Sequence, residues 1–135
     1  MLAGAVLLWL GALSGYDAVC RRLPNWLTLP GAVSILAGAA LAGRGGPAAA
    51  GALALAGVYL LVHLVVPTAL GAGDVKLALG VGALTGCFGV DVWVLAALGA
   101  PVLTAGWALL RGVRVVAHGV GMCVASAVAV GLVLW

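Results

Sequence analysis

The chain has 135 residues, of which 66% are hydrophobic and only 7% are charged, and its formal net charge is +3. With so few polar residues, the chain could not cover the surface of a soluble globule of this size. The composition therefore excludes a soluble domain and predicts an integral membrane protein that has the lipid bilayer as its partner. The Lys and Arg residues are dispersed rather than gathered into a basic patch, which argues against nucleic acid as a partner.

Apolar runs interrupted by Gly, Pro and charged residues divide the chain into six predicted helices. Their approximate ranges are 1–18, 27–42, 48–66, 74–90, 92–110 and 118–135. We therefore expect an all-α polytopic membrane protein with about six transmembrane helices, in which residues 1–135 form a single membrane-embedded domain. The first run has no preceding Lys or Arg and no convincing cleavage site, which predicts a retained helix rather than a signal peptide.

Small residues in these helices predict close helix packing, for example at Gly82 and Gly86 or at Gly11 and Gly15. The three cysteines are far apart and form no Cys-x-x-Cys pair, so we expect them to be small packing residues: Cys20, Cys87 and Cys123.

Positive charge is distributed unequally between the connecting loops. Loops one, three and five contain or adjoin five basic residues: Arg21, Arg22, Lys76, Arg111 and Arg114. Loops two and four offer only Arg44, against the acidic Asp91. By the positive-inside rule the odd loops are cytoplasmic, which puts both termini outside.

Two aspartates fall where an apolar run meets a short loop. Asp17 ends the first predicted helix and Asp74 begins the fourth, so two crossings separate them and both are expected at the cytoplasmic face. Asp91 lies one crossing beyond Asp74, and a helix of that length spans about 25 Å, so Asp91 is not expected to join the pair. Acidic residues at a bilayer are costly, and a functional role is their default interpretation.

Two adjacent carboxylates that share a proton can hydrolyse a peptide bond, because one takes a proton from water while the other protonates the carbonyl oxygen. The chain has no glutamate, and its two histidines form no zinc-binding pair at helical spacing, so we expect neither a metal nor a cofactor. Plain structural alternatives exist for each aspartate. Asp74 could cap a helix, and Asp17 could pair with Arg21 at the i+4 position.

Two motifs carry a resemblance to a known family. The first is Asp17, five intervening residues, then Leu23, Pro24 and Asn25, followed by Leu27, Thr28 and Pro30; the second is Gly71, Ala72, Gly73, Asp74, Val75 and Lys76. In order, spacing and topological side they resemble the type IV prepilin leader peptidases, membrane aspartic proteases of the GxGD class, and the resemblance spans nearly the whole chain.

The resemblance implies that Asp17 and Asp74 are the catalytic pair. It also implies removal of a short basic leader from type IV pilin-like precursors at the cytoplasmic face of the inner membrane. Larger family members carry Cys-x-x-Cys motifs and methylate the new N-terminus, whereas this chain is similar to the short, peptidase-only form. It departs from the Gly-Pro step that many relatives have before the last helix, where it reads Ala-His-Gly-Val over residues 117–120.

Five further residues are expected to shape the site or bind substrate. Gly71 and Gly73 would let the backbone bend sharply and approach an extended substrate. Pro24 and Asn25 predict a re-entry turn in which Asn25 caps the second helix. Lys76 is expected to reach toward the membrane surface or to contact loop residues.

Helix dipoles suggest how the two aspartates divide the work. Asp74 lies at a helix N-terminus, which favours its ionised form, and Asp17 lies near a helix C-terminus, which does not, so we hypothesise Asp74 as base and Asp17 as acid. Arg21 and Arg22 oppose this assignment by favouring an ionised Asp17. His63 and His118 are expected near the cytoplasmic helix ends, where satisfied structural histidines are the commoner case.

Two other functional classes remain. A small proton- or ion-coupled transporter would use intramembrane acids as a relay, for which Asp91 would be needed in addition to Asp17 and Asp74. A structural subunit of a secretion or pilus assembly would tolerate the loss of both acids. The sequence leaves open whether the chain forms a homo-oligomer.

Overall fold

The fold is a bundle of six helices. The computed structural model describes residues 2–20, 25–66, 72–112 and 118–134. The helices are α1 (Leu2–Cys20), α2 (Asn25–Leu41), α3 (Gly45–Val65), α4 (Ala72–Gly86), α5 (Val90–Arg111) and α6 (His118–Leu134). Within these residues there is no β-strand. The prediction of an all-helical chain with six helices is therefore confirmed.

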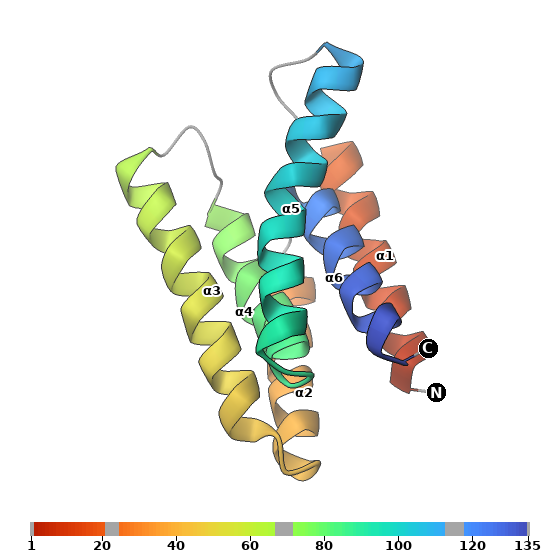
Figure 1. Cartoon of the computed structure of the whole chain (residues 1–135), viewed down its shortest axis with the longest axis vertical. Helices are drawn as coiled ribbons and strands as arrows, with labels where there is room; N and C mark the ends of the chain where they lie inside the picture. The colour runs from red at the N-terminus through yellow and green to blue at the C-terminus, as the bar shows by residue number, and fades with distance from the viewer. Residues whose placement is uncertain (1, 21–24, 67–71, 113–117, 135) are drawn as a thin grey trace.

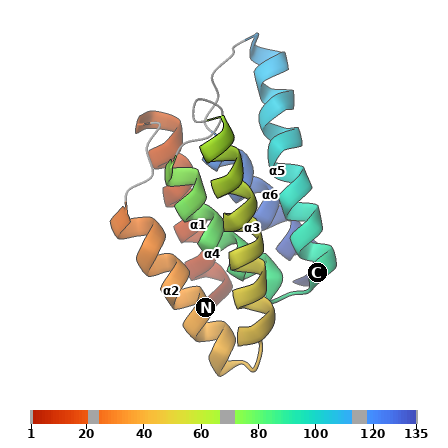
Figure 2. The same cartoon turned by 90° about the vertical axis from the view of Figure 1, so that its left-hand side faces the viewer.

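Successive helices run in alternating directions, and the two ends of the chain lie at the same end of the bundle (Figure 1). Helix α4 is the inner element, because it contacts α2, α3, α5 and α6 (Figure 1, Figure 2). Accordingly, Leu77, Ala78, Val81 and Ala83 of α4 are almost completely buried. Helix α1 packs mainly on α6 and α2, which places its last turn beside the first turn of α6.

Glycines bring the backbones of α3 and α4 close together. A methyl group at Gly82 would lie 2.5 Å from the carbonyl oxygen of Gly51, and one at Gly86 would lie 2.7 Å from that of Pro47. No side chain larger than hydrogen fits there, which confirms the predicted close packing at Gly82 and Gly86. The same prediction for Gly11 and Gly15 is wrong for contacts within the chain, because a methyl group on either would meet nothing within 4 Å.

The outer surface of the bundle is apolar. Large hydrophobic side chains on every outer helix are exposed, including Leu8, Leu61, Leu109 and Leu132, whose exposed fractions are 77%, 63%, 83% and 68%. Two helices, Gly45–Val65 and Val90–Arg111, are long and apolar enough to cross a bilayer, and shorter apolar helices accompany them. Exposed apolar area on this scale indicates a lipid-facing surface.

Helix ends agree with the predicted ranges to within about four residues, the largest difference being the end of α4. It ends at Gly86 rather than near residue 90, because a turn over residues 87–89 finishes at Gly89 with a φ of 118°. Helix α5 ends where Gly112 adopts the left-handed conformation with a φ of 64°, the usual way for glycine to stop a helix.

Candidate active site

The two aspartates of interest lie at the same end of the bundle. Asp17 belongs to the last turn of α1 and Asp74 is the third residue of α4, and these two helix ends point to the same side in Figure 1. Asp91 lies in the first turn of α5, at the opposite end. The fold therefore separates Asp91 from the other two by the length of the bundle, as the alternation of helices requires.

Asp17 is buried against the first turn of α6, with an exposed fraction of 5%. Its Oδ2 atom accepts a hydrogen bond from the Val120 backbone N–H at 3.2 Å. A methyl group placed on Gly119 would lie 2.5 Å from the same oxygen, so the carboxyl group rests directly on the α6 backbone. The positive end of the α6 dipole thus faces Asp17 and opposes the field of its own helix.

Asp74 is half-buried in the first turn of α4, where the helix dipole favours a negative charge. Helix α4 begins at Ala72, so Asp74 lies inside the helix rather than capping it. The Cys123 thiol on α6 lies within electrostatic reach of both Asp17 and Asp74, and the Tyr59 hydroxyl on α3 lies within reach of Asp74. The helices that carry the two aspartates, α1 and α4, both pack against α6.

The predicted site-shaping residues have different outcomes. Lys76 Nζ donates a hydrogen bond to Asn25 Oδ1 at 2.7 Å, which ties the start of α2 to α4 two residues beyond Asp74. Gly73 is the second residue of α4 and is helical. Pro24 and Gly71 lie outside the described residues. Of the two roles expected for Lys76, reaching toward the membrane surface or contacting a loop residue, this hydrogen bond to the first residue of α2 resembles the second, although the sequence did not indicate Asn25 as the partner.

A hydrogen-bond chain that the sequence does not indicate lies beside Asp17. His118 Nε2 lies 2.9 Å from the Tyr59 hydroxyl, and His118 Nδ1 lies 2.9 Å from Thr104 Oγ1. The partners come from α3 and α5, so this histidine joins three helices. The sequence marked His118 only as a histidine near the right helix end, and neither Tyr59 nor Thr104 carries a local signal of pairing.

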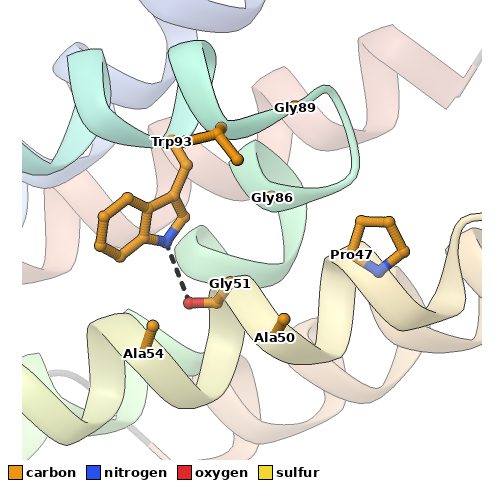
Figure 3. A pocket seen from close by; sticks show the side chains of 8 residues that line it. Pro47, Ala50, Gly51, Ala54, Gly86, Gly89 and Trp93 are labelled. Atoms are coloured by element: carbon orange, nitrogen blue, oxygen red, sulfur yellow. Dashed lines mark hydrogen bonds between the residues drawn. The ribbon is translucent and has the colours of Figure 1, made fainter.

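A cavity of about 390 Å³ lies at the opposite end of the bundle from Asp17 and Asp74, between α3 and the turn that joins α4 to α5 (Figure 3). Its lining is apolar, and the Trp93 indole N–H at its side donates to the Gly51 carbonyl at 3.0 Å. Among the described residues, no group of three or more His, Cys, Asp or Glu side chains is placed to hold a metal ion.

The apolar exterior indicates a helical membrane protein, and the helix turns that carry Asp17 and Asp74 lie at one end of its bundle. The chain matches the type IV leader peptidase family over residues 4–135 and belongs to that family, which makes it a peptidase-type membrane protein. Neither the comparison with curated proteins nor that with solved structures gave a match.

Proposed function

We propose that the chain is an aspartic endopeptidase that removes the short basic leader from type IV pilin-like precursors, with Asp17 and Asp74 as its catalytic pair. Membership of the type IV leader peptidase family supports the substrate class. The observation that carries the catalytic assignment is that Asp17 and Asp74 lie at one end of the bundle, on helices α1 and α4 that both pack against α6.

The proposed reaction needs only the two carboxyl groups and a water molecule. The ionised carboxylate takes a proton from water as the water oxygen bonds to the scissile carbonyl carbon, while the carboxylic acid gives its proton to the carbonyl oxygen. The resulting gem-diol collapses when the first carboxyl group, which now holds the water proton, gives it to the amide nitrogen, the second, now ionised, takes a proton from a gem-diol hydroxyl, and the C–N bond breaks. One proton shared by two neighbouring carboxylates satisfies both roles.

The location of the site suits cleavage beside the membrane. A peptide bond inside a transmembrane helix is protected by its hydrogen bonds, whereas a segment just outside the bilayer can be presented in extended form. A site at the end of the bundle is therefore suited to a leader that precedes the apolar helix of its substrate. Arg111, in the last turn of α5, and Lys76, in α4, lie at this end and favour its cytoplasmic location.

We accordingly propose a multi-pass protein of the inner membrane with six crossings, both termini outside and the site at the cytoplasmic face. Gly71 and Pro24 would shape the peptide-binding loops around the pair, Gly73 would let the substrate approach the first turn of α4 closely, and Lys76 and Asn25 would hold two of the helix ends together. Residues 1–135 would act as one peptidase domain within the lipid bilayer.

The test is cleavage of a synthetic precursor, a basic leader followed by an apolar helix, by the protein reconstituted in liposomes. Asp17→Asn and Asp74→Asn should each abolish release of the leader while leaving the protein folded and inserted. Asp91→Asn, a matched loss of one carboxylate at the other end of the bundle, should cleave normally. Substantial cleavage by the Asp17 or Asp74 variant would refute the two-aspartate mechanism.

A further inference from the structure

The hydrogen-bond chain of Tyr59, His118 and Thr104 lies beside the aspartates and has no part in the proposed reaction. Thr104 Oγ1 has a single proton, which it donates to the Ala100 carbonyl at 2.9 Å. Toward His118, Thr104 Oγ1 is therefore an acceptor, and the proton of that bond belongs to His118 Nδ1.

This determines the form of the neutral imidazole. A neutral histidine with a proton on Nδ1 has a free electron pair on Nε2, so the Tyr59 hydroxyl donates to His118 Nε2. The protons run in one direction, from Tyr59 to His118 to Thr104 to the Ala100 carbonyl. Both ring nitrogens are occupied, which fixes the imidazole ring between α3 and α5.

Fixing His118 also fixes the backbone that contacts Asp17. His118 is the first residue of α6, and Gly119 and Val120 follow it directly. The Val120 N–H donates to Asp17 Oδ2, and the Gly119 amide faces the same carboxylate. A helix rises about 1.5 Å per residue, so a slip of α6 by one residue would bring the Val120 N–H out of hydrogen-bonding distance of Asp17.

The Tyr59 end of this hydrogen-bond chain lies near Asp74, the second aspartate. Tyr59 is almost completely buried, and its hydroxyl is within electrostatic reach of Asp74. The hydrogen-bond chain therefore begins near Asp74 and passes through His118, the first residue of the α6 turn that contacts Asp17.

We infer that His118 is a positioning residue of the active site. Held by Tyr59 and Thr104, it keeps the first turn of α6 in the register that presents the Val120 N–H to Asp17, and so sets the distance between the two carboxyl groups. The inference rests on the proposed function. It assigns no proton transfer to His118, whose effect on the reaction passes through the α6 backbone.

Two substitutions remove one hydroxyl each and keep the shape of the side chain: Tyr59→Phe and Thr104→Val. Each should lower kcat for leader release by about fivefold to tenfold with KM within twofold of the wild type, because the substrate-binding surface is untouched. Since the two substitutions act through the same histidine, the double variant should be little slower than the slower single variant.

Thr85→Val is the matched control. Thr85 is also a buried threonine whose hydroxyl donates to the carbonyl four residues earlier, at 2.8 Å, but it lies in the part of α4 remote from Asp74. It should keep the wild-type kcat. An equal fall in kcat for Thr85→Val and Thr104→Val would mean that loss of any buried hydroxyl slows the enzyme, and it would overturn the inference.

A second measurement is independent of activity. In ¹⁵N-labelled protein in detergent micelles, His118 should have its proton on Nδ1, and the Val120 amide proton should resonate downfield because it binds a carboxylate. Thr104→Val should move the Val120 resonance, and Thr85→Val should not. A Val120 resonance that Thr104→Val leaves in place would overturn the inference even where activity falls.

The outcomes for this inference and for the proposed function are distinct. If Asp17→Asn and Asp74→Asn are inactive while Tyr59→Phe and Thr104→Val keep wild-type kcat, the positioning role is refuted and the peptidase assignment stands. If either asparagine variant cleaves, the peptidase mechanism itself is refuted.

Discussion

Gly119→Ala tests the contact between α6 and Asp17 with the smallest available change. The added methyl carbon would lie 2.5 Å from Asp17 Oδ2 and 2.9 Å from its Cγ. Ordinary contact begins at 3.4 Å, so the carboxyl group and the helix turn must separate by about 0.9 Å. The carboxyl group lies at the end of a side chain and can rotate away, which disrupts its hydrogen bond with Val120 without requiring the bundle to unfold.

The expected result is a protein of nearly normal stability and greatly reduced activity. A displacement near 1 Å in a catalytic group costs about a hundredfold in rate, and we expect kcat for leader release to fall by that factor. Alanine favours a helix over glycine by about 1 kcal/mol, which partly offsets the steric cost in the free energy of unfolding. The assay is leader release in liposomes, paired with thermal unfolding in detergent.

Gly131→Ala is the matched control for this prediction. Gly131 lies in the same helix, and a methyl group there would meet nothing within 4 Å. This variant should cleave at the wild-type rate and unfold at an equal or higher temperature. A folded Gly119→Ala protein that cleaves within threefold of the wild type would show that the contact with α6 does not set the position of Asp17, and would refute the reasoning.

Three more predictions concern other parts of the bundle. Asp91→Asn should cleave at the wild-type rate, which would count against the transporter alternative. Loss of cleavage would mean that the reaction needs Asp91, at the opposite end of the bundle from Asp17 and Asp74. Lys76→Met and Asn25→Ala should each slow cleavage by about threefold, and the double variant should be no slower, because both remove one hydrogen bond; additive kinetic effects would refute this. Gly82→Ala should lower the free energy of unfolding by about 2 kcal/mol, as the methyl group meets backbone that cannot move aside, whereas exposed Gly38→Ala should not. Equal melting temperatures for these two glycine variants would contradict the packing argument.

The helices and their ends could be predicted from the sequence because each is a local property. Apolar runs broken by Gly, Pro and charge mark the six helices, and their alternation alone puts Asp17 and Asp74 at one end and Asp91 at the other. Glycine packing could be predicted only in part. Gly11 and Gly15 have the same spacing as Gly82 and Gly86, and only the position of α4 among four other helices makes the second pair buried.

The surroundings of the aspartates could not be predicted, because they depend on which helices are neighbours. Tyr59 and Thr104 are separated from His118 by 59 and 14 residues, and nothing in the residues around them indicates that three helices meet there. The hydrogen bond from Val120 to Asp17 spans 103 residues. Such contacts follow from the packing of α6 between α1 and α5, which a helical pattern does not encode.

The position of α6 also changes the argument for the acid and base roles. The dipole argument favours Asp74 as base only if Asp17 experiences the field of its own helix α1 alone. The first turn of α6 presents its positive end to Asp17 and so offsets the field of α1. Exposure still separates the two residues, because Asp17 is buried and Asp74 is half-buried. Burial disfavours a charged carboxyl group, and water reaches the more exposed one first, so the same assignment follows from a different cause.

The chain has three acidic residues, all aspartates, which makes this assignment directly measurable. In protein labelled with ¹³C at the aspartate carboxyl carbons, Asp17 should have the chemical shift of a carboxylic acid at neutral pH. Asp74 should have the shift of a carboxylate, and asparagine variants of the three aspartates assign the resonances. A protonated Asp74 beside an ionised Asp17 would reverse the roles, because the more accessible residue would then be the proton donor.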